Sequence, residues 1–532
     1  MLKFVLCTFF ALLLFPLLSY GQYIPLDNHF YDLIMQKSQA NNTSLLSSMK
    51  PLLLQDMDSL ADTENALYQV PGNAKHKNTF VYRKLFSENL IRYKTKDFSI
   101  TADPVFNFGL GYDIKEPKNT WINSRGFTVT GLIGKTLSFN TELYENQGVF
   151  ASWPDSIIRA TGVVPGQGAT KPFKDTGVDF FYCNGYVSYS PSKYINMTLG
   201  YGKNFIGDGY RSMILSDVSF SYPYLKLTAN FKKVKYTVLY NQFIDRSSTL
   251  SSGFGLDRKW ATMHYLQVML WGRLSLGIFD AIVWENADST GYRGFDIQYL
   301  NPVILIMRPV EESFGSPDNA LMGGTFSLRI NKHFNVYGQL LLDEFKLSEV
   351  MANDGWWANK FGYQLGISGW NLLNIPTLNA RIEYNQARPY TYAYDKTIES
   401  YGHYNQPLAH PLGANFREFI AMASYIRGNW MVHLKLNFAM YGVDTAGMDF
   451  GKNIFIPYNQ RVSEYGNEIG QGLKTNLAIV DFNISYLLNR RTNLRLEAGF
   501  TNRKEHNTKW DKQMQFIYFG IRTGLRNIYY DF

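Results

Sequence analysis

Few residues in this sequence have the types and spacing that chemistry on a substrate requires. Gly366-Ile367-Ser368-Gly369 is one residue short of the G-x-S-x-G motif that presents a serine nucleophile in esterases. Gly134-Lys135-Thr136 matches the end of a phosphate-binding loop, but Val129 stands where the first glycine is required. The glycines between 200 and 209 lack the strand–helix–strand context of a dinucleotide site. An esterase with His264 or His433 as its base is the enzymatic alternative, and the favoured interpretation is a protein without enzymatic activity.

Metal and cofactor sites are not indicated either. His403 and His410 are seven residues apart, without a clearly paired carboxylate, and are expected to be solvated loop histidines. The two cysteines are Cys7 and Cys183, and Cys7 lies in a leader that should be removed. The mature chain then has one thiol, which excludes disulfide scaffolds and cysteine-rich metal centres. The sequence predicts no cofactor.

Charge and composition exclude two further classes. The formal net charge of +8 comes from 52 basic and 44 acidic residues, a mild excess that does not call for nucleic acid. The chain is 45% hydrophobic, 16% aromatic and only 18% charged over 532 residues, so it is not disordered. The aromatic content is unusually high, and the fold has to account for it.

Residues 1–21 have the features of a secretory signal peptide. Lys3 precedes an apolar stretch, and the small residues Ser19 and Gly21 occupy the −3 and −1 positions of a cleavage site. An N-terminal membrane anchor is the alternative. The style of this leader resembles exported proteins of Bacteroidota. No later apolar run reaches about 20 residues, so the exported protein is either soluble or a β-barrel.

Strict alternation of apolar and polar residues favours the barrel. In residues 431–440, 480–488 and 493–500, every second residue is apolar, and polar or charged residues occupy most of the positions between them. These segments are near ten residues long, which is the length that crosses a bilayer at a tilt. The pattern predicts an all-β fold, a transmembrane antiparallel β-barrel, and the excess of Tyr, Phe and Trp suits its interfacial girdles.

The connections between these segments predict about 18 strands from residue 97 to 532. Short and long connections alternate, and in outer-membrane barrels the short turns are periplasmic and the long loops extracellular. Both ends of the chain are then expected in the periplasm. Ile528, Tyr530 and Phe532 alternate at the end of the chain, as in the terminal strand of many barrels. The predicted short turns are near 136–138, 190–193, 232–233, 272–274, 331–333, 371–376, 427–430 and 488–491, and the predicted long loops are near 113–125, 152–177, 203–221, 244–259, 286–320, 346–359, 385–414, 443–474 and 501–513.

Residues 22–96 do not alternate and are predicted to form a small periplasmic, partly helical segment. Asp27 is placed to cap a helix from Asn28 to about Gln39, and residues 52–66 and 80–93 are weaker helical candidates. A disordered lead-in is the alternative.

The polar faces of the strands carry charges of both signs that should point into the lumen. Such residues can form a structural plug of ion pairs or line a selective, water-filled pore, and the sequence leaves both open. The residues concerned are Lys235, Arg329, Arg381, Glu383, Lys435, Asp481, Arg495 and Glu497.

Aromatic residues in two predicted outer loops suggest a ligand. Sugar C–H faces stack on aromatic rings while the hydroxyls find polar side chains, so exposed rings among polar residues suit carbohydrate. The alternative is that these rings continue the outer aromatic girdle. The candidate polysaccharide-binding residues are Trp356, Trp357, Tyr390, Tyr392, Tyr394, Tyr401 and Tyr404.

Two stretches resemble a known family. Residues 200–217, and the Tyr299–Pro302 motif followed by residues 316–330, are similar to the capsule-assembly barrels typified by Wzi, whose Bacteroidota relatives include the gliding-motility protein RemB. The resemblance implies a non-enzymatic barrel that holds or organises surface polysaccharide, or that supports adhesion and gliding with surface adhesins or motility proteins as partners. The residues that carry the signature are Gly207, Asp208, Gly209, Arg211, Ser212, Ser216, Asp217, Asn301 and Pro302.

The sequence therefore predicts an outer-membrane barrel, embedded in lipid, that binds cell-surface polysaccharide for capsule or exopolysaccharide assembly or attachment. A porin-type channel for small solutes is the alternative, because a charged lumen also suits solute passage.

Overall fold

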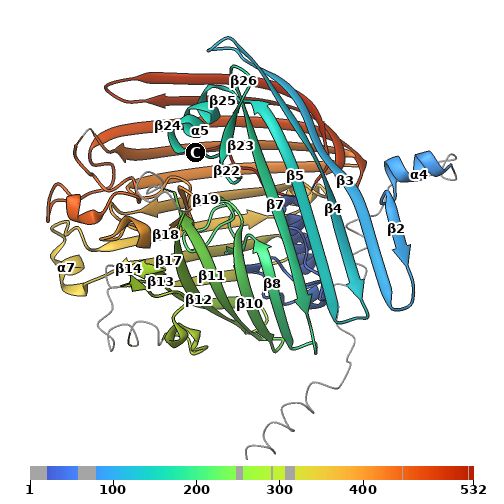
Figure 1. Ribbon diagram of the computed structural model, residues 1–532, viewed down its shortest axis with the longest axis horizontal. Coiled ribbons are helices and arrows are strands. Elements are labelled where there is room, and N and C mark those ends of the chain that lie inside the picture. Colours follow the sequence, from blue (N-terminus) through green and yellow to red (C-terminus); the bar gives the residue numbers. More distant parts are fainter. Residues whose placement is uncertain are drawn as a thin grey trace, which may run out of the picture.

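A computed structural model of the chain describes residues 21–57, 79–246, 256–288, 291–305, 309, 318–445, 447–524 and 526–532. Eighteen antiparallel strands form a closed ring (Figure 1), and the ring is completed where β26 pairs with β3, with Phe516 opposite Asp113. The predicted all-β fold class and the predicted number of barrel strands are both confirmed. Among the described residues, no helix is both long and apolar enough to cross a lipid bilayer.

The strands of the ring are 8 to 17 residues long. In chain order they are β3 (Phe98–Asp113), β4 (Lys118–Ile133), β5 (Leu137–Val149), β7 (Gly177–Tyr189), β8 (Ile195–Gly202), β10 (Tyr222–Asn230), β11 (Val234–Asp245), β12 (Asp257–Leu270), β13 (Leu274–Glu285), β16 (Asn319–Arg329), β17 (Phe334–Glu344), β18 (Lys360–Gly369), β19 (Asn379–Ala387), β22 (Phe416–Arg427), β23 (Trp430–Val443), β24 (Leu473–Asn489), β25 (Leu494–His506) and β26 (Asp511–Arg522).

Smaller elements occupy the connections and the segment before β3. The helices are α2 (Asn28–Ala40), α4 (Phe80–Phe86), α5 (Ser152–Thr161) and α7 (Leu347–Ala352), with 3₁₀ turns η1 (Leu54–Met57), η2 (Ile297–Leu300), η3 (Leu372–Asn374), η4 (Thr397–Glu399) and η5 (Tyr458–Gln460). The short strands are β1 (Met49–Lys50), β2 (Ile91–Lys94), β6 (Thr170–Phe173), β9 (Phe205–Ile206), β14 (Ala287–Asp288), β15 (Gly291–Tyr292), β20 (Gly402–His403) and β21 (Gln406–Pro407).

The connections define two ends of the barrel. All eight predicted short turns lie between consecutive ring strands, at what we call the turn end, and the other connections lie at the loop end. Two predicted long loops, 113–125 and 501–513, are wrong, because the strands continue and tight turns join them at 114–117 and 507–510. Asp113 and Asn507 cause these turns, since each side-chain oxygen accepts hydrogen bonds from backbone N–H groups two and three residues later.

The N-terminal segment lies inside the turn end of the barrel (Figure 1, dark blue behind β5 and β7). The predicted helix is present as α2, and the Asp27 carboxylate caps it by accepting the N–H groups of His29 and Phe30. Ion pairs then hold the segment to the wall, with Asp32 at 3.0 Å from Arg381 and Asp56 at 2.6 Å from Lys235. The segment therefore has its partners on the inner wall of the barrel. The alternating pattern of the strands does not predict these contacts.

The two weaker helical candidates are only partly helical. In the first, η1 covers Leu54–Met57, and residues 58–66 lie outside the described residues. In the second, α4 ends at Phe86 and the chain continues as β2, which pairs with β3. Backbone pairing with the adjacent ring strand thus replaces the helix that the composition predicted for residues 87–93.

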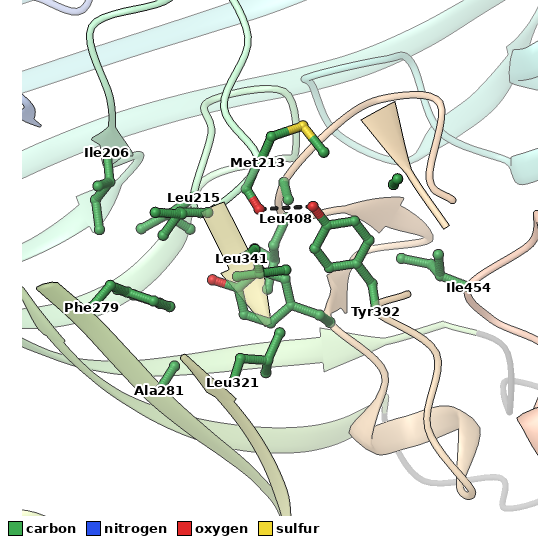
Figure 2. Close-up of a cluster of buried hydrophobic side chains, with 14 of the residues drawn as sticks. Ile206, Met213, Leu215, Phe279, Ala281, Leu321, Leu341, Tyr392, Leu408 and Ile454 are labelled. Carbon is green, nitrogen blue, oxygen red and sulfur yellow. Dashed lines mark hydrogen bonds between the residues drawn. The ribbon is translucent and has the colours of Figure 1, made fainter. Parts of the chain in front are cut away.

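Two loops fold from the loop end into the lumen and form its apolar core. Residues 203–221 and 388–415 bring Ile206, Met213, Leu215 and Leu408 against the inward faces of β11–β13, β16 and β17 (Figure 2). Tyr392 joins the two loops, because its hydroxyl donates to the carbonyl of Met213 at 2.7 Å. The same cluster includes inward side chains of β22–β24, such as Tyr441 and Leu477, so the two loops fill the loop end of the lumen between β10 and β24 with packed side chains.

The segment after β26 also lies inside the barrel, which corrects the predicted terminal strand. β26 ends at Arg522, and the chain turns at Gly524, whose φ of +92° and closeness to the Tyr144 hydroxyl leave no room for a side chain. Ile528, Tyr530 and Phe532 do not form a strand, and the chain ends within the outline of the ring (Figure 1). Residues 527–531 form hydrogen bonds to interior side chains in place of pairing with a neighbouring strand.

The predicted lumen charges face inward, and most are paired with one another or with the inserted segments. Arg495 contacts Glu497 at 2.9 Å, and Glu497 also contacts Arg522. Lys435 contacts Asp531, and the Asp481 carboxylate accepts the Thr501 hydroxyl. Arg329 donates to the carbonyls of Thr43 and Gly272, and Glu383 accepts the N–H groups of Tyr210 and Arg211. Near the inserted segments the charges therefore act as structural ties.

Replacing Asp56 by Ala should release the N-terminal segment. Asp56 and Lys235 are both nearly fully buried, and removing one partner leaves a buried charge that costs about 3–5 kcal/mol. Limited proteolysis of the folded barrel should then cut within residues 21–57 much faster than in the wild type. Asp97→Ala removes an exposed carboxylate at the same end and should leave the cleavage rate unchanged. Equal rates for the two variants would contradict the docking described here.

Candidate functional site

Four aromatic residues form a cluster at the loop end, where the loops after β17, β19 and β23 meet. We call Trp356, Trp357, Tyr394 and Tyr458 the aromatic cluster. Trp357 and Tyr458 have ring centroids 4.8 Å apart, Tyr394 and Tyr458 are 5.8 Å apart, and the two tryptophans are 6.3 Å apart. All four side chains are half-buried, so each ring is held by neighbours and still presents part of its surface to solvent.

Backbone hydrogen bonds hold these loops together. After α7, the chain reverses at Asn353 and Gly355, both with positive φ, and a Cβ on Gly355 would lie 2.7 Å from the Asn467 nitrogen. Trp357 N–H then donates to the Glu464 carbonyl at 2.9 Å, and Gly466 N–H donates to Asp354. The rings therefore sit on a rigid platform, which lowers the entropy cost of ligand binding.

Charged and amide groups surround the aromatic cluster. The Arg461 guanidinium lies 4.1 Å from the centre of the Trp357 ring, and the Lys346 ammonium lies 5.5 Å from that of Trp356. Asn459 donates to the Asp395 carboxylate at 2.8 Å beside the same rings. Aromatic faces with adjacent guanidinium, carboxylate and amide groups suit a ligand with apolar faces and many hydroxyls.

Three of the predicted binding tyrosines are buried, which corrects the expectation that they are exposed. Tyr390, Tyr392 and Tyr401 have at most 1% of their surface accessible. Tyr390 donates to the Asp449 carbonyl at 3.0 Å, and Tyr401 donates to the sulfur of Met263. Because loop 388–415 folds into the lumen, these rings pack in the interior and their hydroxyls are occupied, so they offer no surface to a sugar.

The remaining predicted residues divide between two places. Trp356, Trp357 and Tyr394 belong to the aromatic cluster, whereas half-buried Tyr404 packs against Phe220 with ring centroids 4.9 Å apart. Tyr458 and Arg461 were missed by the sequence analysis. The signal that would have found them is the long 443–474 connection, in which Tyr458 and Tyr465 lie among polar and charged residues.

The loop histidines are buried, contrary to the expectation that they are solvated. His403 accepts the Ile244 N–H at Nδ1 and contacts the Ser221 carbonyl through Nε2, and burial lowers the pKa of His403 to about 3. His410 Nε2 lies 2.7 Å from Glu418. Each histidine joins two segments within the lumen. Among the described residues, no group of three or more His, Cys, Asp or Glu side chains is arranged to hold a metal ion.

The first half of the family-like signature anchors loop 203–221 inside the barrel. The Asp208 carboxylate accepts the hydroxyls of Ser47 at 2.9 Å and Ser48 at 2.6 Å, which ties the loop to the N-terminal segment. At Gly209, a Cβ would lie 2.4 Å from the Glu383 carboxylate, so any larger residue would require the Glu383 side chain to move. At Gly207, with φ of +143°, the N–H donates to the Ser48 carbonyl.

The centre of this arrangement is a buried network around Arg211. Its guanidinium contacts Glu418 and Asp531, each at 3.2 Å, and also donates to the Asp531 carbonyl at 2.7 Å. Burial acts to raise the pKa of Asp531, but Arg211 and Lys435 outweigh it, so the pKa of Asp531 is lowered and the carboxylate stays ionised. Asn437 completes the network by donating to Glu418 and to the Asp531 carbonyl.

The other signature residues in this loop tie it to the remaining inserted segments. Ser212 bridges within the loop, donating to the Ile206 carbonyl and accepting the N–H groups of Ile214 and Leu215. Ser216 donates to carbonyls of loop 388–415. Asp217 accepts the Tyr529 hydroxyl at 3.0 Å and the Asn527 amide at 2.9 Å.

Asn301 and Pro302 lie elsewhere, on the outer wall. Residues 291–305 form an outer strap across the outward faces of β11–β13, where the Tyr236 hydroxyl donates to Pro302 and the Tyr240 hydroxyl to Leu300. Asn301 accepts the Val303 N–H at 3.1 Å. The signature therefore marks two separate structural sites. Positions 316 and 317 of the resembling stretch lie outside the described residues.

The two strand histidines of the esterase alternative lie on opposite faces of the wall. His264 points outward beneath the outer strap, with Nδ1 3.1 Å from Asp280, whereas His433 lines an interior cavity of about 460 Å³.

Comparison with known proteins defines the class of this fold. No protein-family model and no curated protein sequence matches the chain. The structure is similar to Wzi, an outer-membrane protein of Escherichia coli involved in group 1 capsule assembly and described as a carbohydrate-binding β-barrel. The TM-score is 0.56 at 13% identity, over 94% of this chain and 99% of Wzi. Similarity at this level of identity establishes the fold alone, a closed antiparallel β-barrel.

Two barrels of Pseudomonas aeruginosa are less similar. OprD matches with a TM-score of 0.42 at 9% identity over 80% of this chain and 94% of its own. OpdK, solved with vanillate, matches with a TM-score of 0.44 at 8% identity over 80% of this chain and 98% of its own.

Replacing Arg211 by Ala should destabilise the barrel strongly. The variant leaves the Glu418 carboxylate fully buried without its guanidinium partner, which costs about 3–5 kcal/mol. The midpoint of urea unfolding in detergent should fall accordingly. Arg417→Ala, an exposed arginine next to Glu418, should change stability by no more than about 0.5 kcal/mol. A wild-type midpoint for Arg211→Ala would show that the network contributes little.

Proposed function

We propose that this chain is a non-enzymatic outer-membrane β-barrel that binds or organises cell-surface polysaccharide through the aromatic cluster. The observation that carries the proposal is a rigid, half-buried group of four rings, with charged and amide neighbours, at the loop end of a barrel. Capsule or exopolysaccharide assembly or attachment is the process that such binding would serve. The similarity in fold to Wzi, itself described as carbohydrate-binding, supports this proposal.

The outer wall supports placement in a lipid bilayer. Large apolar side chains project from several sides of the ring with half or more of their surface exposed, among them Leu199 at 68%, Phe519 at 58% and Leu365 at 51%. Apolar side chains on the outward face of a closed antiparallel ring are the pattern of membrane barrels. A role in gliding motility, with surface adhesins as partners, stays a prediction from the family resemblance.

The alternative of a porin-type channel meets a constraint. At the loop end the inserted loops fill the lumen with packed side chains between β10 and β24, so any passage has to run there along the remaining wall.

Replacing Trp356 and Trp357 together by Ala should weaken retention of surface polysaccharide by roughly tenfold or more. We take about 0.5–1.5 kcal/mol for each lost ring, by analogy with aromatic pairs, and 1.4 kcal/mol corresponds to about tenfold in affinity. The measurement is the polysaccharide retained on washed cells that express each variant at equal levels. Heat-modifiable gel migration should show a folded barrel in each case.

Trp510→Ala is the matched control, because Trp510 is also half-buried at the loop end but lies on the β25–β26 hairpin, away from the aromatic cluster. Retention equal to wild type in the double variant would argue against the proposal. Misfolding of the double variant would favour the girdle interpretation of these rings.

Epitope tags at the two ends should differ in accessibility on intact cells. A tag inserted at Asn353, at the loop end, should be cleaved by added protease, whereas a tag at Asn331, at the turn end, should be protected until the outer membrane is opened. The expectation follows from the orientation of long loops toward the cell exterior. Protection of both tags, or cleavage of only the Asn331 tag, would overturn this orientation.

A further inference from the structure

Two cavities lie along the wall of the lumen that the inserted loops leave free. The first has a volume of about 460 Å³ and reaches Trp121 and Pro154 near the loop end. The second has a volume of about 720 Å³ and reaches Lys94 and Lys135 at the turn end. Together they extend along the inward faces of β3–β5 and β22–β26 from one end of the barrel toward the other.

Arg526 and Asn527 separate the two cavities, because both residues belong to the lining of each. The Arg526 guanidinium lies over the rings of Tyr144 and Tyr182, at 4.2 and 4.3 Å from their centres. Asn527 accepts the Asn28 N–H at 2.9 Å, so the segment after β26 bridges from the barrel wall to the N-terminal segment.

One nitrogen of this barrier has no protein partner. Arg526 Nη1 is buried and makes no hydrogen bond within the described part of the chain. A buried guanidinium donor without a partner costs free energy unless water or an anion satisfies it. Its position between two cavities places this donor where a passing solute would meet it.

The mouth at the turn end favours anions. The lining of the larger cavity carries seven Lys or Arg residues against three acidic residues, Asp103, Glu142 and Asp217. Basic side chains around a low-dielectric opening raise the local concentration of anions and select them for passage. The charge of Arg526 continues this field to the place where the two cavities meet.

A small number of side chains hold the barrier in place. Asp217 accepts the hydroxyl of Tyr529 and the amide of Asn527. Deeper along the same segment, Asp531 is fixed by Arg211 and Lys435. The part that separates the cavities therefore depends on Asp217, whereas the part beyond it is anchored in the Arg211 network.

We propose that the two cavities form a passage for small anionic solutes, and that residues 526–529 serve as its gate, while Asp531 stays anchored to Arg211. Closing requires Arg526 over the two tyrosine rings and Asn527 on Asp217. Opening requires only that this stretch leave the wall, since Gly524 supplies a flexible point at the end of β26. The inference rests on the membrane-barrel part of the proposed function and is independent of the polysaccharide-binding part.

Conductance of the purified full-length chain in planar phosphatidylethanolamine–phosphatidylglycerol bilayers tests the passage, with chloride as the probe anion. The wild type should show brief openings. In a KCl gradient, its reversal potential should lie toward the equilibrium potential of chloride. Asp217→Ala should increase the fraction of time spent open by at least about tenfold, because two hydrogen bonds to a charged group are lost. Arg526→Ala should increase single-channel conductance by about twofold and reduce the preference for chloride.

Arg526→Lys is the charge-retaining control and should keep the preference for chloride, and Arg417→Ala, on the outer wall, should behave as the wild type. Folding of every variant is checked by heat-modifiable migration, and the wild-type reversal potential gives a result even where a variant does not fold. A folded wild type that conducts no ions, or that prefers potassium, would overturn the passage. Unchanged open time and conductance in folded Asp217→Ala and Arg526→Ala would overturn the gate. A chain that never forms a heat-modifiable barrel would instead refute the proposed membrane barrel.

Discussion

The buried guanidinium of Arg211 is the interaction on which the interior of this barrel depends. It joins loop 203–221 to Glu418 on β22 and to Asp531 in the segment after β26. A ring of eighteen strands is too wide for wall side chains to fill, so other segments must enter the lumen. Their backbone and charged groups then need partners away from water, and the Arg211 network supplies several of these at one point.

The inserted segments divide the lumen into two unlike halves. At the loop end, between β10 and β24, apolar side chains from two loops pack against the wall. Along β22–β26 and β3–β5, charged and hydroxyl-bearing side chains line cavities. The packed half gives the loop end a fixed surface, which a binding site for an extended glycan requires. The polar half leaves room for solutes, so the two proposed activities use different parts of one molecule.

Aromatic residues in the same loop have opposite roles because of where the loop turns. Tyr392 and Tyr401 lie on the stretch that descends into the lumen, where burial of the ring is favourable and the hydroxyl finds an acceptor. Tyr394 lies at the rim, where it meets Tyr458 of a different loop. The composition of the loop is therefore a poor guide to exposure, and the path of its backbone decides which rings a ligand can reach.

The sequence by itself determined the wall of this protein, because alternation along each strand reports directly on a local property, the two faces of a pleated sheet. It predicted the barrel, its strand number, all eight short turns and the helix capped by Asp27. Only the tertiary structure decided what fills the lumen that this wall encloses. Alternation carries no information on whether a loop such as 388–415 folds outward or inward, or on whether Ile528, Tyr530 and Phe532 extend the sheet. That choice depends on partners hundreds of residues away, such as Arg211 for Asp531, which only the closed ring brings together.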